Sequence, residues 1–94
     1  FAKHKALQEF YEGVVGLADD FAEAYQGRHG LIGPITLQTA KKNGNITEFI
    51  QDSLDEIEAN RYKVCEEKDT AIQNIIDEIV ALYLKTLYML KFLA

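Results

Sequence analysis

The sequence contains few of the residues that interrupt helices or cross-link a chain. Its 94 residues include one proline, no tryptophan, six glycines and a single cysteine, Cys65. One thiol cannot form a disulfide within the chain, so nothing indicates an oxidising compartment, and we expect a cytoplasmic protein. The most apolar stretch, residues 79–94, contains Lys85 and Lys91 and is shorter than the roughly 20 residues that cross a bilayer. We therefore expect a core helix there and no membrane contact.

The chain has fewer basic residues than acidic ones. Ten Lys and Arg against fifteen Asp and Glu give a formal net charge of −5, which argues against nucleic-acid contact through this domain. Hydrophobic residues make up 48% and charged residues 27%, the balance of a globular helical protein. At this length the chain supports one core, so residues 1–94 are expected to form a single domain. It begins with Phe1 rather than Met, and we expect further residues upstream.

The spacing of apolar residues predicts three amphipathic helices. Apolar side chains recur every three to four residues over 3–26, 46–64 and 70–93. The first helix is expected to end within 26–30, where two glycines and two cationic side chains occur. Asn45 followed by Glu48 predicts a capped start for the second helix. Asp69 is expected to cap the start of the third helix. Gly13 and Gly16 are expected to mark the close approach of a neighbouring helix.

The apolar face of the third helix covers nearly half of its circumference. A face that wide contacts more than one partner, and three helices bury such faces incompletely. We therefore predict an all-α, ferritin-like four-helix bundle whose first helix is missing or truncated, or is supplied by another copy of the chain. Residues 30–45 fit a crossover between helices on opposite sides of such a bundle. Leu84 and Phe92 fall outside the apolar arc and are expected to be exposed or to contact another chain.

Two short features within 30–45 remain open at this stage. Residues 35–37 are compatible with a short extended segment. Lys41 and Lys42, beside the turn pair Asn43 and Gly44, form a basic turn that we interpret as a solvated loop.

A polar stripe follows one side of the first predicted helix. At 100° per residue, five side chains fall within one narrow arc away from the apolar face: His4, Gln8, Glu12, Asp19 and Glu23. Two carboxylates one turn apart and an imidazole on the same helix are ligands that iron and manganese accept. A solvated acidic face is the alternative interpretation.

The residues of this helix carry a resemblance to a known family. Phe1-Ala2-Lys3-His4, Phe10-Tyr11-Glu12 and Asp19-Asp20-Phe21-Ala22-Glu23 resemble the second helix of the DNA-protection-during-starvation proteins, a twelve-subunit branch of the ferritin-like family. The resemblance implies that His4, Asp19 and Glu23 are metal ligands of a ferroxidase site shared between two subunits. Most of the chain is also similar to small uncharacterised ferritin-like proteins encoded by tailed bacteriophages, which implies action in the host-cell cytoplasm.

The sequence departs from that family in several places. The family's site also takes a His from the preceding helix, which would lie before His4 and outside this sequence. Gln8 stands where the family often has an additional acid, and no Lys-rich tail is present.

Other metal and catalytic sites fit the sequence poorly. A di-iron centre within one bundle needs Glu-x-x-His motifs on two helices, and the chain has none. One Cys and two distant His do not make a zinc site. Glu66 and Glu67 disfavour a reactive thiolate at Cys65, and no catalytic residue is predicted.

Two functions follow as expectations. The first is a homo-oligomeric, ferritin-like protein that binds ferrous iron at a subunit interface through His4, Asp19 and Glu23, and oxidises it. The second is a non-catalytic helical assembly or interaction protein, in which the same stripe simply faces water.

Overall fold

The computed structural model describes residues 2–32 and 45–93, and these residues form three α-helices. Helix α1 spans Ala2–His29, α2 spans Ile46–Val64 and α3 spans Thr70–Phe92. The all-helical architecture with three helices confirms the coarse fold prediction. Helix α1 continues three residues past 26 and ends within the predicted range 26–30. The extended segment predicted at 35–37 and the basic turn at 41–44 lie outside the described residues.

Local side chains fix the helix ends, as the sequence predicted. The side-chain oxygen of Asn45 accepts a hydrogen bond from the backbone N–H of Glu48 at 2.8 Å, and Asp69 accepts one from Ile72 at 3.4 Å. Both carboxamide and carboxylate thereby satisfy N–H groups that the first helical turn leaves unpaired. Helix α1 ends at Gly30, which has a φ of +95°, a left-handed conformation that glycine adopts without strain.

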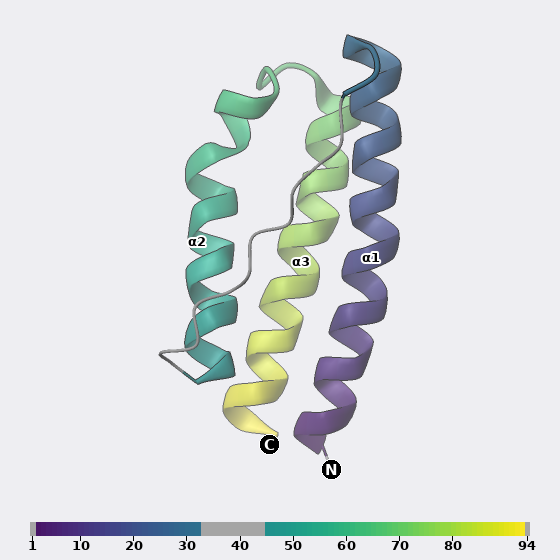
Figure 1. The fold of residues 1–94 in the computed structure, drawn as a ribbon. Coiled ribbons are helices and arrows are strands. Elements are labelled where there is room, and N and C mark those ends of the chain that lie inside the picture. Colours follow the sequence, from purple (N-terminus) through teal and green to yellow (C-terminus); the bar gives the residue numbers. More distant parts are fainter. Residues whose placement is uncertain (1, 33–44, 94) are drawn as a thin grey trace.

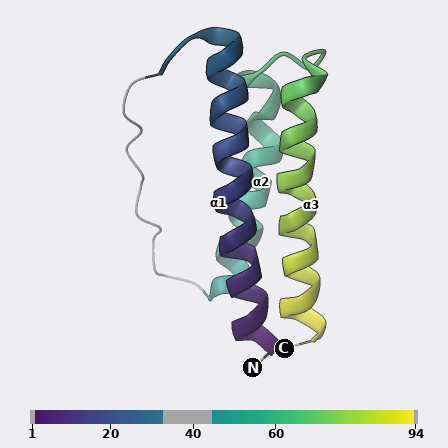
Figure 2. The ribbon, with the colours of Figure 1, turned by 90° about the vertical axis from the view of Figure 1, so that its right-hand side faces the viewer.

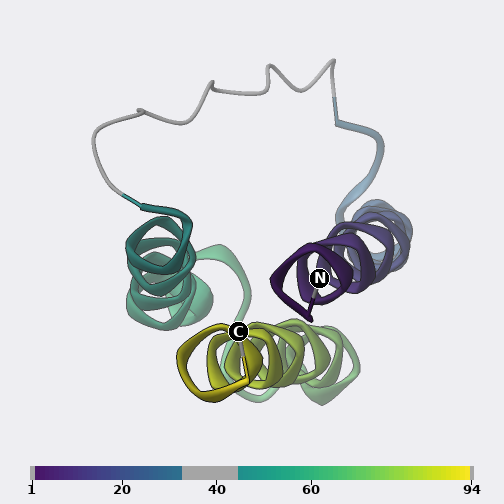
Figure 3. The same cartoon turned by 90° about the horizontal axis from the view of Figure 1, so that it is seen from below.

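Helix α3 lies between the other two helices (Figure 1). Helices α1 and α2 run in the same direction, and α3 runs antiparallel to both (Figures 1 and 2). Both pack against α3, whereas no Cα atom of α1 comes within 8 Å of one in α2. Seen along the helices, α3 therefore lies at the point of a V, with α1 and α2 at the ends of its two arms (Figure 3).

The connection from Gly30 to Asn45 joins opposite ends of this arrangement, because α1 ends where α2 finishes rather than where it begins (Figure 1). The parallel direction of α1 and α2, on either side of α3, agrees with the predicted crossover. The start of α1 and the end of α3 lie side by side at one end of the molecule.

The core lies along the two faces of α3. Near the end where α1 begins, the buried residues come from all three helices: Ala6, Phe10, Ile50, Leu54, Leu87 and Leu90. Phe10 meets Tyr83 edge-to-face with ring centroids 4.9 Å apart. At the other end Cys65, Ile72 and Ile76 form a second cluster against Phe21 and Ile57. Burial on both sides explains why α3 needs so wide an apolar face.

The two glycines of α1 differ in their surroundings. A Cβ atom on Gly13 would lie 2.8 Å from Cδ2 of Leu82, so α1 and α3 approach closely there, as predicted. A Cβ on Gly16 would meet nothing within 4 Å, so the same prediction is wrong for Gly16, which faces away from α3. No described helix is long and apolar enough to cross a membrane.

Candidate functional site

The predicted metal ligands lie on the outside of α1. Every member of the α1 stripe is exposed: His4, Gln8, Glu12, Asp19 and Glu23. They fall about 160° to 260° around the helix from Ala6, which is buried against α3. Gln8 donates to Glu12 at 3.3 Å. As predicted, the stripe points away from the core of its own chain.

One chain does not bring the three predicted ligands together. His4 and Asp19 are fifteen residues apart, which is about 22 Å along a helix at 1.5 Å per residue. Asp19 and Glu23 are one turn apart, close enough to share an ion. Among residues 2–32 and 45–93, no group of three or more His, Cys, Asp or Glu side chains is gathered closely enough to hold a metal ion.

An apolar groove separates α1 from α2, with α3 as its floor. It has a volume of about 450 Å³. Phe21 contributes the α1 wall, Ile57 and Val64 contribute the α2 wall, and Ile79 and Tyr83 form the floor. Val64 is 48% exposed, although its spacing predicts a place in the apolar stripe of α2. Burial raises the pKa of the Tyr83 hydroxyl above its ordinary value, so this phenol stays protonated.

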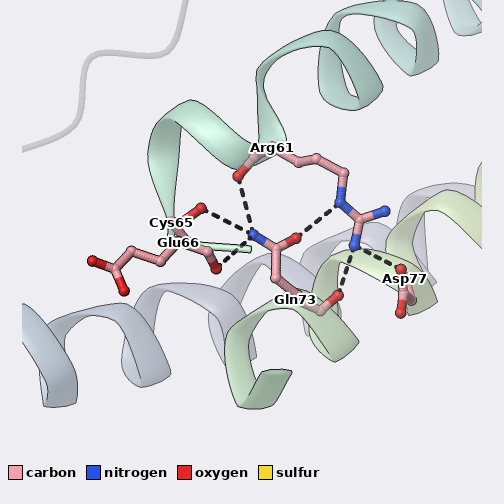
Figure 4. Close-up of polar contacts among 5 residues, drawn as sticks. All are labelled: Arg61, Cys65, Glu66, Gln73 and Asp77. Carbon is pink, nitrogen blue, oxygen red and sulfur yellow. Dashed lines mark hydrogen bonds and ion pairs between the residues drawn. The ribbon is translucent and has the colours of Figure 1, made fainter. Parts of the chain in front are cut away.

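Gln73 and Arg61 form a polar cluster where α2 ends (Figure 4). The buried Gln73 side-chain N–H₂ donates to the backbone carbonyls of Arg61, Cys65 and Glu66 at 3.1–3.3 Å. In return Arg61 Nε donates to Gln73 Oε1 at 2.8 Å.

The guanidinium of Arg61 makes two further contacts, both with α3. It donates to the backbone carbonyl of Gln73 at 3.0 Å and to the Asp77 carboxylate at 2.6 Å. The cluster therefore fixes the end of α2, and the turn that follows it, to α3. This cluster leaves no signal in the sequence, because a glutamine at the margin of an apolar face has no distinctive spacing.

Cys65 belongs to this end of the core and carries no reactive feature. Its thiol is buried and free. Burial, and to a lesser extent the charge of Asp69, raise the pKa of the Cys65 thiol above its ordinary value. The thiol thus stays protonated and poorly nucleophilic.

A polar hollow lies between the end of α1 and the turn that joins α2 to α3. Arg28 forms a two-pronged ion pair with Asp69, both N–O distances being 3.1 Å. His29, Glu66 and Lys68 line the same hollow. His29 is the last residue of α1, and its ring lies against that of Tyr25 with centroids 4.5 Å apart and planes tilted by 42°.

The comparisons with known proteins identify a family but no function. The chain belongs to DUF5856, a family of unknown function, whose family model matches residues 1–90. Neither the curated proteins nor the solved structures give a significant match.

Proposed function

We propose that this protein is a self-associating, ferritin-like helical protein that takes up ferrous iron between the α1 helices of two copies. His4 of one copy would supply a nitrogen ligand, and Asp19 and Glu23 of the other would supply oxygen ligands. Iron is the substrate here, and its oxidation by peroxide or dioxygen is the reaction class. The observation that carries the proposal is the position of the α1 stripe, exposed along the side of α1 opposite the buried Ala6.

Helix geometry supports a site that two copies share. If two α1 helices run antiparallel about an axis level with Glu12, His4 of each copy lies level with Asp19 of the other, because 4 and 19 are nearly equidistant from 12. The ligands that one chain keeps about 22 Å apart along the helix thus come to the same height. Two Glu12 carboxylates would face each other near the axis, and their repulsion favours a bound cation.

The chain topology supports the ferritin-like part of the proposal. In such bundles two parallel helices are joined by a long crossover, and α1 and α2 are related in this way. In a four-helix bundle the remaining helix would lie between α1 and α2, diagonally opposite α3. The groove between α1 and α2 has this position. Its apolar walls suit a helix with an apolar face, namely the first helix of the proposed bundle.

Ferrous binding by variant proteins tests the proposal. The double variant Asp19→Ala, Glu23→Ala removes the proposed oxygen ligands, and its exposed positions leave the fold intact. The control is Glu9→Ala, Asp20→Ala, which removes two exposed acids from the same helix on a different side. We expect anaerobic titration calorimetry to show ferrous uptake by the wild type and the control, and at least about tenfold weaker uptake by the first variant.

A wild-type protein that takes up and oxidises no iron above the buffer background would end the iron proposal. The α1 stripe would then be a solvated face, and the protein a non-catalytic helical assembly or interaction protein.

A further inference from the structure

The outer face of α3 is apolar and uncovered. We use this name for Ala81, Leu84, Tyr88 and Phe92, which follow one another at intervals of three to four residues on the side of α3 turned away from the groove. Leu84 is 53% exposed, Tyr88 55% and Phe92 71%. The rings of Tyr88 and Phe92 lie next to each other, with centroids 5.7 Å apart and their planes tilted by 47°, so the two side chains form one exposed aromatic surface. Such a surface is larger than a singly exposed side chain and marks an interaction site.

Charges of opposite sign occupy the two halves of the same helix. Asp77 and Glu78 are its only acids, and residues 79–93 contain none. Lys85 and Lys91 are its only bases, and residues 70–84 contain none. Within the described residues, neither Glu78 nor Lys85 forms an ion pair, because the two pairs present are Arg28–Asp69 and Arg61–Asp77. All four charged side chains are exposed.

We propose that the outer face of α3 binds the outer face of α3 in a second copy of this chain, in antiparallel orientation. The charge pattern selects both the partner and the direction. A helix that is acidic in its first half and basic in its second complements an antiparallel copy of itself, whereas a parallel copy would oppose like charges. With the twofold axis between residues 81 and 82, Glu78 lies level with Lys85 of the partner subunit, and the pair occurs twice.

The apolar residues fit the same register. Ala81 falls at the axis, where its small side chain lets the two helices approach closely. Leu84 then packs beside Ala81 of the partner subunit. Tyr88 and Phe92 extend the contact towards both ends, where they cover the uncharged polar residues Asn74 and Thr70 of the partner subunit. Burial of these side chains supplies the affinity, while the exposed ion pairs set the orientation. The α3 contact uses a different helix face from the α1 stripe and does not rest on the iron proposal.

Charge reversal tests the orientation. Lys85→Glu alone and Glu78→Lys alone each turn two attractive pairs into two repulsive ones. We expect sedimentation equilibrium to show a dimer dissociation constant raised at least about tenfold in each single variant. The double variant Glu78→Lys, Lys85→Glu restores both pairs, and we expect it to dimerise as the wild type does. Lys63→Glu reverses an exposed charge on α2 and serves as the control.

Mixing the single variants gives the sharper result. In a one-to-one mixture, each copy of the first variant offers two acids to two lysines of the second, so we expect mixed dimers with near wild-type affinity. A wild-type chain that stays monomeric at about 1 mM overturns the proposal. Single variants that dimerise like the wild type, or a mixture that fails to dimerise, overturn the antiparallel register. Far-UV circular dichroism confirms that each variant is folded.

A cysteine at the axis provides an independent measurement. Ala81→Cys places two thiols about 1.5 Å apart along the helix direction, within reach of a disulfide. The control Asn74→Cys separates the thiols by about 22 Å. We expect mild oxidation to convert Ala81→Cys, but not Asn74→Cys, into a covalent dimer. Cys65 is only 4% exposed and contributes no cross-link to either. Equal cross-linking of the two variants contradicts the register.

Discussion

Gln73 shows how much a single buried polar side chain contributes to the position of a helix. It is 5% exposed, and its side chain both donates to the end of α2 and accepts from Arg61. Of the three carbonyls that it meets, that of Arg61 also accepts from the backbone N–H of Cys65, and that of Glu66 from the backbone N–H of Asp69. The carbonyl of Cys65 accepts from Gln73 alone among the described residues. Without the Gln73 carboxamide, the Cys65 carbonyl would lose its hydrogen bond, and the polar contact between α2 and α3 would be reduced to the bonds of Arg61 with the Gln73 carbonyl and Asp77.

Replacement of Gln73 by leucine tests this role. Leucine keeps the approximate volume but removes the hydrogen bonds to the carbonyls and to Arg61. We expect Gln73→Leu to lower the free energy of unfolding by about 2 kcal/mol, as measured by urea denaturation. The matched control is Gln51→Leu, which removes only a hydrogen bond to Asp55 on the surface and should change stability by less than about 0.5 kcal/mol. Equal effects of the two substitutions would contradict the assigned role.

The glycines of α1 give a second comparison at the residue scale. Gly16→Ala adds a methyl group that meets no atom, so the gain in helix propensity, about 1 kcal/mol, should raise the free energy of unfolding. Gly13→Ala brings the same gain, but its methyl group forces Cδ2 of Leu82 to move. We therefore expect Gly16→Ala to be the more stabilising in thermal denaturation. A more stable Gly13→Ala would show that α1 and α3 are less tightly packed there.

At the scale of the helices, the sequence was informative wherever a local signal exists. Caps at Asn45 and Asp69 and the glycine end at Gly30 depend on neighbouring residues alone, so the ends of α2 and α3 could be predicted closely. The outward position of the α1 stripe followed from periodicity. Contacts between helices left no such signal: Gly13 and Gly16 look alike in sequence, and only the position of Leu82 distinguishes them.

In the candidate site, too, local features could be predicted from the sequence and contacts between helices could not. Periodicity predicted that His4, Asp19 and Glu23 share an outward side of α1, and they do. It could not reveal Gln73 or Arg61, because their partners lie seven to sixteen residues away along the chain and meet only after α2 and α3 have packed. The width of the α1–α2 groove likewise depends on how both helices cross α3.

At the scale of the whole molecule, two faces point away from the shared core. The α1 stripe and the outer face of α3 belong to different helices, and each is proposed to contact a second copy. Two distinct twofold contacts on one chain generate a closed assembly or a filament rather than a simple dimer. The contacts differ in chemistry, because the first is polar and dependent on a cation while the second is apolar and depends on paired charges.

The central claim is that iron lies between two copies, and the coupling of association to iron tests it most directly. The measurement is anaerobic sedimentation velocity in the Lys85→Glu background, where the α3 contact is weakened. We predict that ferrous ion raises the sedimentation coefficient of this protein, and that the further substitution His4→Ala abolishes the increase. An unchanged sedimentation coefficient on addition of ferrous ion, or an increase that persists without His4, would contradict the shared site.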